Sequence, residues 1–535
     1  MATRFYNTLA HGIEEFVPLA AGPDAAHPLR GAVVSMYTCG PTVYDFAHIG
    51  NFRAFLFADV LRRFLEFRGA TVRQVMNMTD VGHMTDDAHA DAGGEDKMEV
   101  AQKRMKESKK QGKAAVENPE DPYQVAQYFV DAFLADARAL QVEVVRDFDA
   151  AQGEAKQRIM PRPTEFIGRF VKMIETLIGN GHAYVGTDGV VYYAVNSFPG
   201  YGKLSGNSVE KLSHGAGGRT AESAAKRHPA DFFLWKPDAS HVMRWPSPWG
   251  EGYPGWHIEC SAMATGLLGP SIDIHTGGED NIFPHHECEI AQSEAATGQK
   301  FARFWMHTRH LMVNGEKMSK SKGNFFTIRD LVGKGYDPLV IRLALIAARY
   351  RESMDFSLKG LQEAASALTT LRDLAEKLQM TVASVDEAAG EAARESDVLE
   401  AERGMLKEFG EALDDDLNMA GALATVFTWA APVTKQKKVA YPQARSGLEA
   451  LKRVDHVLGV IFPPLRPLGE EVRGRVEALM RERNAARAAK EWGKSDALRA
   501  ELAGLNVEVK DGAGGSTWRV RLAPAGGAGG VVSSQ

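Results

Sequence analysis

The clearest pattern of apolar and polar positions lies between residues 33 and 78. Val33–Tyr37 is apolar and favours a strand. We expect this strand to end near Cys39, because Gly40 and Pro41 follow. Apolar residues then recur at the spacing of one helix face, and Asn51 is suited to cap that helix. These apolar positions are Phe52, Phe55, Leu56, Val60, Phe64 and Phe67.

The segment Thr71–Met78 alternates and predicts a second strand, parallel to the first because a helix separates the two. Strand, helix and strand form a βαβ unit, whose first loop offers backbone N–H groups and a positive helix end to an anion. His48 and Gly50 lie in that loop, where a phosphate ligand would bind. An ordinary βα unit without a ligand is the alternative interpretation.

The remaining pattern is mostly helical. Helices are predicted at residues 81–122, 122–140, 163–180 and, with breaks, from 361 to about 502. Asp337 and Pro338 provide a cap and a first helical residue for another helix. Short strands are predicted at residues 506–510 and 516–521. The irregular parts are an extended lead-in at 1–30, a glycine-rich surface insertion at 198–229 and a linker at 380–396.

The composition is that of a globular protein, with 44% hydrophobic and 25% charged residues. A chain of 535 residues is too long for one core, so we expect about three domains. No apolar run approaches the roughly 20 residues of a membrane helix, and the N-terminus lacks a signal-peptide pattern. Three widely spaced cysteines argue against a disulfide framework and favour the cytoplasm. Because the net charge is −6, any surface for nucleic acid must be locally basic.

A second candidate site is the segment Lys317-Met-Ser-Lys320-Ser321. Lysines among small polar residues predict a mobile cationic loop, which could neutralise a triphosphate as charge develops during phosphoryl or adenylyl transfer. A solvated surface loop is the alternative interpretation.

Together, the loop at His48 and the lysine segment resemble the HIGH and KMSKS signatures of class I aminoacyl-tRNA synthetases. The sequence elsewhere in the chain resembles the cysteinyl-tRNA synthetase family in three stretches: Tyr37–Tyr44, Gly255–Met263 and Phe283–Gln292. The resemblance runs from the opening at Phe5 to about residue 521. It implies an α/β fold with a Rossmann-like parallel-sheet catalytic domain and an inserted acceptor-end region. An α-helical bundle and a small mixed α+β anticodon-binding module would follow.

We expect six segments on this basis. They are the first half of the catalytic domain at 1–120, an inserted connective region at 121–230, the second catalytic half with the lysine loop at 231–335, a helical bundle at 336–460, the anticodon-binding module at 461–522 and a disordered tail at 523–535. The chain departs from the sequence that is common in this family at Val81-Gly82-His83-Met84, where many members carry acidic residues. The polar stretch from there to residue 122 is either a solvated helix face or a contact to the tRNA acceptor stem.

Cysteine, histidine and carboxylate side chains suggest a metal site. If their segment is helical, His285 and Glu289 project from one face and suit two ligands of one ion. With Cys39 and Cys260 they form a plausible zinc set, although distant cysteines are also common core residues. The resemblance implies that these four residues bind one Zn²⁺. Cys288 is the alternative to Glu289, and we interpret it as a packed thiol.

The resemblance also implies the nucleotide and amino-acid sites. The catalytic residues would be His48, Asn51, Lys317 and Lys320, with the lysines covering the pyrophosphate of ATP. The ATP-binding residues would be Gly50, Gly277, Gly278, Asp280 and Lys320. The pocket for cysteine would be formed by Gly40, Thr79 and Trp256. An ordinary turn at the paired glycines and a merely buried tryptophan are the alternatives.

A stretch near the C-terminus combines arginines with Trp492, which suits stacking on an unpaired RNA base. A charged helix with one core tryptophan is the alternative. The resemblance assigns four residues to the tRNA anticodon: Arg487, Trp492, Asp496 and Asp511.

The implied reaction is the zinc-dependent and ATP-dependent ligation of L-cysteine to the 3′ end of tRNA(Cys) through cysteinyl-adenylate. Mg²⁺ would accompany ATP, and we expect a cytoplasmic monomer that binds no membrane. Two other hypotheses are a cysteine-activating ligase with a non-tRNA acceptor and a non-catalytic tRNA-binding paralogue.

Overall fold

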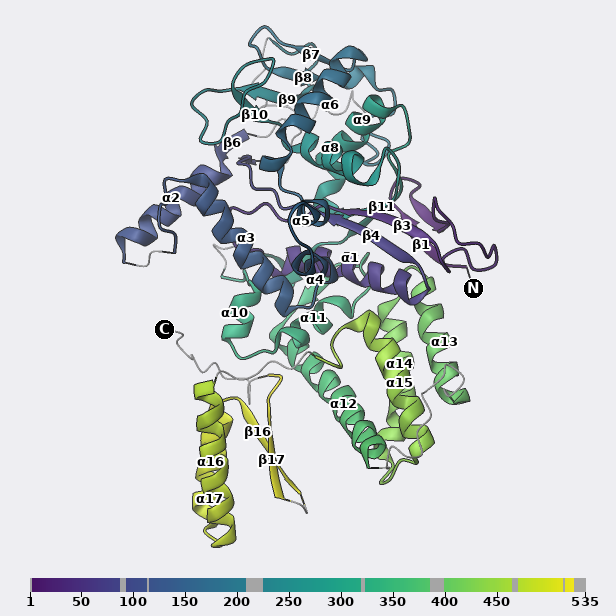
Figure 1. The fold of residues 1–535 in the computed structure, drawn as a ribbon, viewed down its shortest axis with the longest axis vertical. Helices are drawn as coiled ribbons and strands as arrows, with labels where there is room; N and C mark the ends of the chain where they lie inside the picture. The colour runs from purple at the N-terminus through teal and green to yellow at the C-terminus, as the bar shows by residue number, and fades with distance from the viewer. Residues whose placement is uncertain are drawn as a thin grey trace. The chain divides into compact units, whose positions relative to one another are not determined.

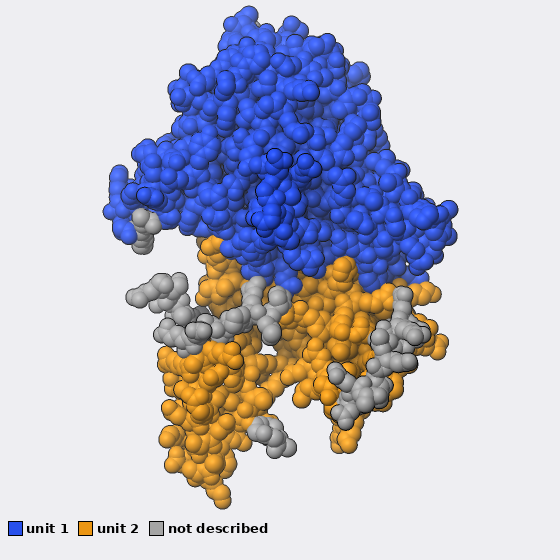
Figure 2. Space-filling model, viewed as in Figure 1, with its two compact units in different colours: residues 1–312, 348–354, 410–421 blue, residues 313–347, 355–409, 422–535 orange. Residues whose placement is uncertain are grey.

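A computed structural model describes residues 2–86, 93–112, 115–207, 225–318, 323–384, 399–463, 470–512 and 515–523. The chain forms two compact units (Figure 2). The first comprises Met1–Met312, Ala348–Met354 and Gly410–Gly421, and the second comprises Val313–Ala347, Asp355–Phe409 and Ala422–Gln535. The predicted bundle at 336–460 is therefore shared between the two units, while the six-segment division stays a prediction.

The first unit is organised around a four-stranded sheet in the order β12-β11-β3-β4. Its strands are β3 (Val33–Thr38), β4 (Thr71–Met76), β11 (Ile272–Gly278) and β12 (Ala302–Thr308). All neighbouring strands are parallel, and Ile274 lies opposite both Met36 and Phe304. Since the chain winds outward in both directions from β3 and β11, these two central strands form a topological switch point. The predicted α/β parallel-sheet fold is confirmed.

Helices cover both faces of this sheet (Figure 1). One face carries α1 (Ile49–Phe67), and the other carries α6 (Ile167–Gly179), α8 (Trp256–Leu268) and α9 (Glu287–Thr297). The second face holds a large apolar core, in which Tyr37 and Val75 of the sheet pack with Met263 and Ile290 of the helices. Because buried strands alternate their side chains, this core also receives Cys39, at the end of β3.

The start of α1 differs from the prediction. His48, not Asn51, is the N-cap, and its Nδ1 accepts from the Asn51 N–H at 3.2 Å. Asn51 Oδ1 accepts in turn from the His48 N–H at 3.1 Å. The helix thus begins three residues earlier than the apolar spacing indicated, because a reciprocal capping box satisfies its first N–H groups. The second predicted strand ends at Met76 rather than Met78.

An antiparallel sheet interrupts the parallel one, in the order β10-β9-β8-β7. Its strands are β7 (Ala183–Val185), β8 (Val191–Tyr193), β9 (Phe232–Pro237) and β10 (Gly252–Pro254). We expected the catalytic fold to resume near Asp231, but β9 pairs with β8, and the parallel sheet resumes only at β11. Most of the predicted surface insertion, residues 208–224, lies outside the described residues.

Two hairpins replace predicted irregular or helical segments of the first unit. β1 (Arg4–Asn7) and β2 (Gly12–Glu15) pair within the expected lead-in. β5 (Met84–Asp86) and β6 (Gly93–Asp96) pair where a helix was predicted, so only α2 (Lys97–Lys110) of residues 81–122 is a long helix.

The other helical elements before α8 are α3 (Pro122–Ala139), α4 (Glu143–Ala150), α5 (Glu154–Ile159), η1 (Pro163–Glu165) and η2 (Val195–Ser197). Two short helical turns, η3 (Glu279–Asn281) and η4 (Ile282–His286), connect β11 to α9.

The remaining chain is largely helical, as predicted. Its long helices are α12 (Leu358–Ala383), α13 (Glu400–Asp414), α14 (Met419–Lys435) and α15 (Tyr441–Leu458). The shorter elements before them are β13 (Leu311–Val313), β14 (Glu316–Lys317), α10 (Ile328–Gly333), α11 (Pro338–Ile346) and β15 (Met354–Phe356). Asp337 caps α11 and Pro338 is its first residue, which confirms the predicted helix start. Most of the predicted linker lies outside the described residues.

The second unit ends in a small module with its own apolar core. It contains α16 (Glu470–Ala488), α17 (Trp492–Gly504), β16 (Val507–Gly512) and β17 (Gly515–Val520). Val476 and Leu502 of the helices pack with Val507 and Val509 of the hairpin. The predicted short strands are confirmed, whereas the tail from residue 524 lies outside the described residues. Among the described helices, none combines the length and the apolar character needed to cross a bilayer.

Candidate metal and nucleotide site

The candidate site lies at the carboxyl ends of β3 and β11. The Cys39 N–H donates to the Thr276 carbonyl at 3.1 Å, so the two central strands remain joined just where they end. In open parallel sheets this switch point is where ligands bind, since the loops on either side of it diverge. The residues predicted for the metal and amino-acid sites converge here.

Four predicted metal ligands come together at this point: Cys39, Cys260, His285 and Glu289. One donor atom of each lies within 4.8 Å of the others. Cys39 follows β3, Cys260 lies on α8, and His285 and Glu289 lie on consecutive helical turns of η4 and α9. All four are at most 8% exposed. Two sulfurs, one imidazole nitrogen and one carboxylate oxygen are a donor set that suits zinc.

The distances within this cluster are short. Cys39 Sγ lies 3.9 Å from Cys260 Sγ and 3.5 Å from Glu289 Oε1. His285 Nε2 lies 3.1 Å from the same Glu289 oxygen. The donors therefore surround one small volume, as ligands of a single ion would.

Burial controls the protonation of the cluster. It raises the pKa of the Cys39 thiol well above its usual range and also raises the pKa of Cys260. It lowers the pKa of His285 well below its usual range, with His257 adding to the effect. Neutral imidazole is the form that binds metals, and a divalent cation would favour the thiolates that burial alone disfavours. The residues present therefore fit a zinc ion.

Sequence reasoning missed further histidines around this cluster. Cys39 and Glu289 also form a second possible ligand group with His275 and His286. His275 Nε2 lies 2.9 Å from Glu289 Oε2, and His286 Nε2 lies 3.2 Å from Cys39 Sγ. The only sequence signal was their position inside or beside the family-like stretches.

Two other histidines contact the imidazole rings of His285 and His286. His257 Nδ1 lies 2.8 Å from His285 Nδ1, which leaves His285 Nε2 toward Glu289. His307 Nε2 lies 2.8 Å from His286 Nδ1, and burial lowers the pKa of His307 to about 3. Such partners fix the orientation of metal-binding rings and carboxylates.

Cys288 faces away from the cluster. Its Sγ lies 3.3 Å from the Tyr201 hydroxyl, inside the core formed with α6 and α8. Neither possible ligand group includes it. An offset of three residues from His285 points it to another side of α9 than Glu289, at an offset of four.

The residues predicted for the cysteine pocket lie beside the metal cluster. The Gly40 N–H donates to Asn77 Oδ1 at 3.0 Å, and a Cβ on Gly40 would lie 1.8 Å from the Asn77 carbonyl oxygen. Asn77 also donates to Thr79 Oγ1 at 2.9 Å. The Trp256 ring lies 4.3 Å from the His285 ring, measured between centroids.

The divergent stretch after Asp80 also contacts this group of residues through Glu259. His83 Nε2 lies 2.8 Å from Glu259 Oε1, and both side chains are buried. Thr79 Oγ1 donates to the other Glu259 oxygen at 3.3 Å. Local sequence pattern could not connect His83 with Thr79, because both contact Glu259 of α8, which lies 176 residues after His83.

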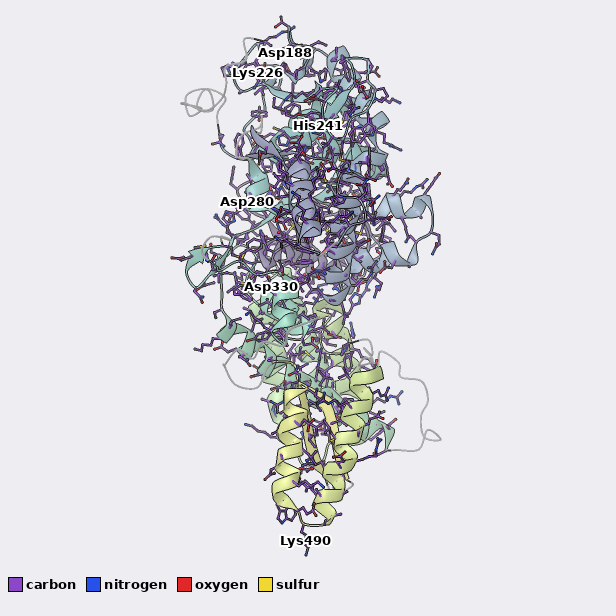
Figure 3. All side chains as sticks on the ribbon, turned by 90° about the vertical axis from the view of Figure 1, so that its left-hand side faces the viewer. Asp188, Lys226, His241, Asp280, Asp330 and Lys490 are labelled. Carbon is purple, nitrogen blue, oxygen red and sulfur yellow. The ribbon has the colours of Figure 1, made fainter. Side chains whose placement is uncertain are left out.

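The predicted nucleotide residues are only partly brought together. His48, Gly50 and Asn51 form the first turn of α1 and its cap. Gly277 and Gly278 end β11, and the Asp280 side chain after them is 76% exposed, at the surface of the first unit (Figure 3). Asp280 Oδ1 lies 3.0 Å from His310 Nε2. Lys317 ends β14 of the second unit, and Lys320 lies outside the described residues.

Comparison with known proteins identifies the family. The family model of the class I (C) tRNA synthetase catalytic domain matches residues 25–366. The DALR domain model matches residues 408–462, and the model of the cysteinyl-tRNA ligase anticodon binding domain matches residues 470–519. The chain belongs to the cysteine–tRNA ligases, a family of class I aminoacyl-tRNA synthetases.

Cysteine–tRNA ligases of other organisms match nearly the whole chain. That of Symbiobacterium thermophilum is 40% identical over 527 residues, covering 97% of this chain and 100% of that protein. That of Salinibacter ruber is 38% identical over 549 residues, covering 97% and 98%. Among solved structures, Mycobacterium tuberculosis methionyl-tRNA synthetase bound by methionyl-adenylate covers 80% of this chain and 92% of its own, with a TM-score of 0.52. At 13% identity this likeness concerns the fold alone.

The anticodon-binding module of this family member shows how its predicted contact residues lie. Trp492 is 59% exposed at the start of α17. It follows the turn at Lys490 that joins α16 to α17 at one tip of the module (Figure 3). Asp511 accepts from Arg483 at 3.0 and 2.8 Å and from Arg487 at 2.9 Å. Both predicted residues, Arg487 and Asp511, thus pair with each other rather than standing free. Asp496 lies on the second turn of α17.

Proposed function

We propose that the chain catalyses the zinc-dependent ligation of L-cysteine to the 3′ end of tRNA(Cys). The cysteine carboxylate attacks the α-phosphate of ATP, releases pyrophosphate and forms cysteinyl-adenylate. The terminal ribose hydroxyl of tRNA then attacks the activated carbonyl and releases AMP. The observation that carries this proposal is the buried S, S, N, O donor cluster at the switch point of the sheet. Family membership supplies the reaction class.

A metal would explain how the enzyme selects cysteine. Serine differs from cysteine only in oxygen for sulfur, and pockets separate near-isosteres by roughly 10- to 200-fold through shape. Zn²⁺ held by Cys39, Cys260, His285 and Glu289 would bind the substrate thiolate and lower its pKa. Thr79 and Trp256, beside the cluster, would then orient the remainder of the amino acid, with the backbone approaching at Gly40.

The nucleotide would bind between the first turn of α1 and the end of β11. His48 and Asn51 would contact the phosphates, while Gly277 and Gly278 would admit the adenosine and Asp280 its ribose hydroxyls. Lys317 and Lys320 would cover the pyrophosphate with its Mg²⁺. Since the lysines act on charge that develops during transfer, their loss should reduce kcat more than ATP affinity.

Recognition of tRNA would use the C-terminal module. Trp492 offers an exposed ring for base stacking, and Arg487 offers a guanidinium for phosphate or base. Asp496 and Asp511 would complete the surface, although Asp511 must share its oxygens with Arg483. None of the three cysteines forms a disulfide, which suits a reducing cytoplasm.

Cysteine-dependent ATP–pyrophosphate exchange tests the activation step. We expect exchange with cysteine, little with serine, and loss of exchange when a chelator removes the metal. Lys320→Ala should retain zinc and reduce exchange by about 100-fold. An enzyme with full zinc and no exchange would contradict the proposal and indicate a tRNA-binding paralogue. Exchange without charging of tRNA(Cys) would indicate a different acceptor.

A further inference from the structure

His83 is a buried histidine that the metal site described above does not use. Neither possible ligand group includes it. It lies in the stretch that departs from the family sequence, four residues after Thr79 of the predicted cysteine pocket. The Lys97 N–H donates to the His83 carbonyl at 2.7 Å, and a Cβ on Gly82 would lie 2.3 Å from Asp96 Oδ1. The hairpin of β5 and β6 therefore holds the backbone at His83 in place.

The His83 side chain begins a series of hydrogen bonds that ends beside the metal cluster. His83 Nε2 lies 2.8 Å from Glu259 Oε1. The other Glu259 oxygen accepts from the Thr79 hydroxyl at 3.3 Å. Thr79 Oγ1 itself accepts from Asn77 Nδ2 at 2.9 Å, and Asn77 Oδ1 accepts from the Gly40 N–H at 3.0 Å. The series thus joins the divergent stretch to the residue that follows the first predicted metal ligand.

Glu259 is enclosed by the protein and can transmit the position of His83. Its side chain is fully buried on α8, directly before the predicted ligand Cys260. A buried carboxylate needs partners for its oxygens, and His83 and Thr79 supply one for each. Removal of the His83 ring would take away the partner of Oε1. The carboxylate could then turn, which would alter its bond to Thr79.

These contacts decide what the Thr79 hydroxyl can offer to a ligand. A hydroxyl has one hydrogen and two lone pairs. The hydrogen of Thr79 is directed at Glu259, and Asn77 donates to one lone pair. The remaining lone pair can only accept, so it suits an N–H group and not a carboxylate. When the thiolate of cysteine is on the metal, its ammonium group is the donor that remains.

Thr79 also lies close enough to the metal cluster for this contact. Its N–H donates to the Pro41 carbonyl at 2.9 Å, and its carbonyl accepts from the Val43 N–H at 2.9 Å. Thr79 is therefore joined to the loop that follows Cys39. Only two carbon atoms separate the sulfur of cysteine from its nitrogen, so the amine of a metal-bound cysteine must bind near the ligands.

We propose that His83 is a positioning residue for the ammonium group of the substrate. Through Glu259, it holds the Thr79 hydroxyl as an acceptor for that group. This proposal rests on the proposed function, because it requires cysteine to bind at the metal cluster. The alternative is a histidine that only stabilises the fold, which would affect all ligands of the pocket alike.

Two fragments of cysteine distinguish these roles on the full zinc-loaded protein. Cysteamine keeps the thiol and the amine, whereas 3-mercaptopropionate keeps the thiol and the carboxylate. Calorimetry measures their affinities, and that of cysteine, for the wild type and for His83→Leu. We expect cysteine and cysteamine to bind about tenfold more weakly to the variant, and 3-mercaptopropionate to bind equally to both. In ATP–pyrophosphate exchange, the KM for cysteine should rise about tenfold while the KM for ATP stays unchanged.

Three further variants test the path of the effect. His83→Gln should recover most of the affinity for cysteamine, because its amide nitrogen can replace Nε2. Thr79→Val removes the hydroxyl, so adding His83→Leu to it should weaken cysteamine by less than about twofold more. His27→Leu changes an exposed histidine elsewhere in the first unit and is the matched control, which should bind all three ligands like the wild type.

Equal weakening of cysteamine and 3-mercaptopropionate in His83→Leu would overturn the proposal. So would loss of zinc from that variant, or independent effects of His83→Leu and Thr79→Val. The binding measurements need no turnover. A wild type that binds cysteine without exchange would therefore contradict the proposed function alone, whereas one that binds none of the three ligands would overturn both.

Discussion

At the scale of single residues, the metal cluster depends on four donors held in a dry core. Water cannot solvate these groups at 0–8% exposure, so each must be neutral, hydrogen-bonded or bound to a cation. The structure offers two overlapping ligand groups that share Cys39 and Glu289. The group with Cys260 and His285 provides two sulfurs, which zinc prefers, whereas His275 is already directed at the outer oxygen of Glu289.

Zinc content should therefore separate ligands from supporting residues. Cys260→Ser and His285→Ala should release zinc on dialysis, because each removes a donor. His275→Ala and His286→Ala should weaken zinc by about 10- to 100-fold, as partners of the ligands do. Metal analysis of purified variants gives the result, with Cys288→Ser as the matched control that keeps its zinc. If His286→Ala loses more zinc than His285→Ala, the metal is instead bound by the second possible ligand group, Cys39, His275, His286 and Glu289.

Asp80 is a second residue with a defined electrostatic state. Its carboxylate accepts from the Thr164 N–H at 3.1 Å and the Thr164 hydroxyl at 2.7 Å. Burial nevertheless raises its pKa from 3.8 to about 6. Since the folded state holds the proton more tightly than the unfolded state, this group favours folding at low pH. Its contribution is lost as the pH rises from about 4 to 6.

Asp80→Asn should consequently show a pH-dependent change in stability. A shift of about two pKa units corresponds to roughly 3 kcal/mol. The stability of the variant relative to the wild type should therefore increase by about this amount as the pH rises from 4 to 7. Thermal unfolding of both proteins over that range measures the difference in Tm. Asp149→Asn is the control: Arg138 lowers the pKa of Asp149, so the stabilising effect of this carboxylate changes only below pH 4, and its difference in Tm should stay constant over the range tested. A difference in Tm that does not vary with pH would contradict the assignment.

At the scale of elements, the end of β11 is packed closely against the turn that follows it. A Cβ on Gly277 would lie 2.7 Å from His286 Cε1 and 3.0 Å from Asn281 Oδ1. At Gly278 the nearest atom would be Asn281 Oδ1, at an ordinary 3.6 Å. The close approach at Gly277 lets His286 reach Cys39, and so connects the strand to the metal cluster.

Alanine substitutions at the two glycines should thus differ. Gly277→Ala must displace His286 and should cost about 1–3 kcal/mol, as overpacked core positions do. Gly278→Ala should leave stability within about 0.5 kcal/mol of the wild type. Thermal unfolding of the zinc-loaded proteins measures both, and equal effects of the two substitutions would show that the β11 end can relax.

At the scale of the whole molecule, the C-terminal module belongs to the second unit, whereas the metal cluster belongs to the first. The module has its own apolar core, and its buried Arg483 holds the strands through Asp511 and Ser516. Trp492 lies outside that core and exposes more than half of its surface. A large exposed ring is typical of a surface that binds a partner.

Trp492→Ala should accordingly weaken the binding of tRNA(Cys) without affecting the activation of cysteine by ATP. Loss of one stacked base costs about 1–3 kcal/mol, or roughly 5- to 150-fold in Kd. Filter binding measures the affinity for tRNA, and ATP–pyrophosphate exchange should stay at the wild-type rate. Val472→Ala, at a 42% exposed position of α16, is the matched control. Unchanged tRNA affinity would place the anticodon contact elsewhere in the module.

Local sequence determined those parts of this protein that depend on neighbours along the chain. The strand before Cys39, the cap and proline of α11 and the C-terminal hairpin followed from apolar spacing and turn residues. An offset of four residues also indicated that His285 and Glu289 share a side of the helix. The capping box at His48 was within reach of the same reasoning, but histidine is not among the usual capping residues.

Tertiary structure decided which distant residues meet. β9 is apolar enough for either sheet, and only its pairing with β8 assigns it to the antiparallel one. His275, His286 and His307 converge on Cys39 because parallel strands bring their carboxyl ends to one edge. His83 reaches Thr79 only through Glu259 of α8. Such contacts join positions far apart in the sequence, so they depend on strand order and helix packing rather than on local pattern.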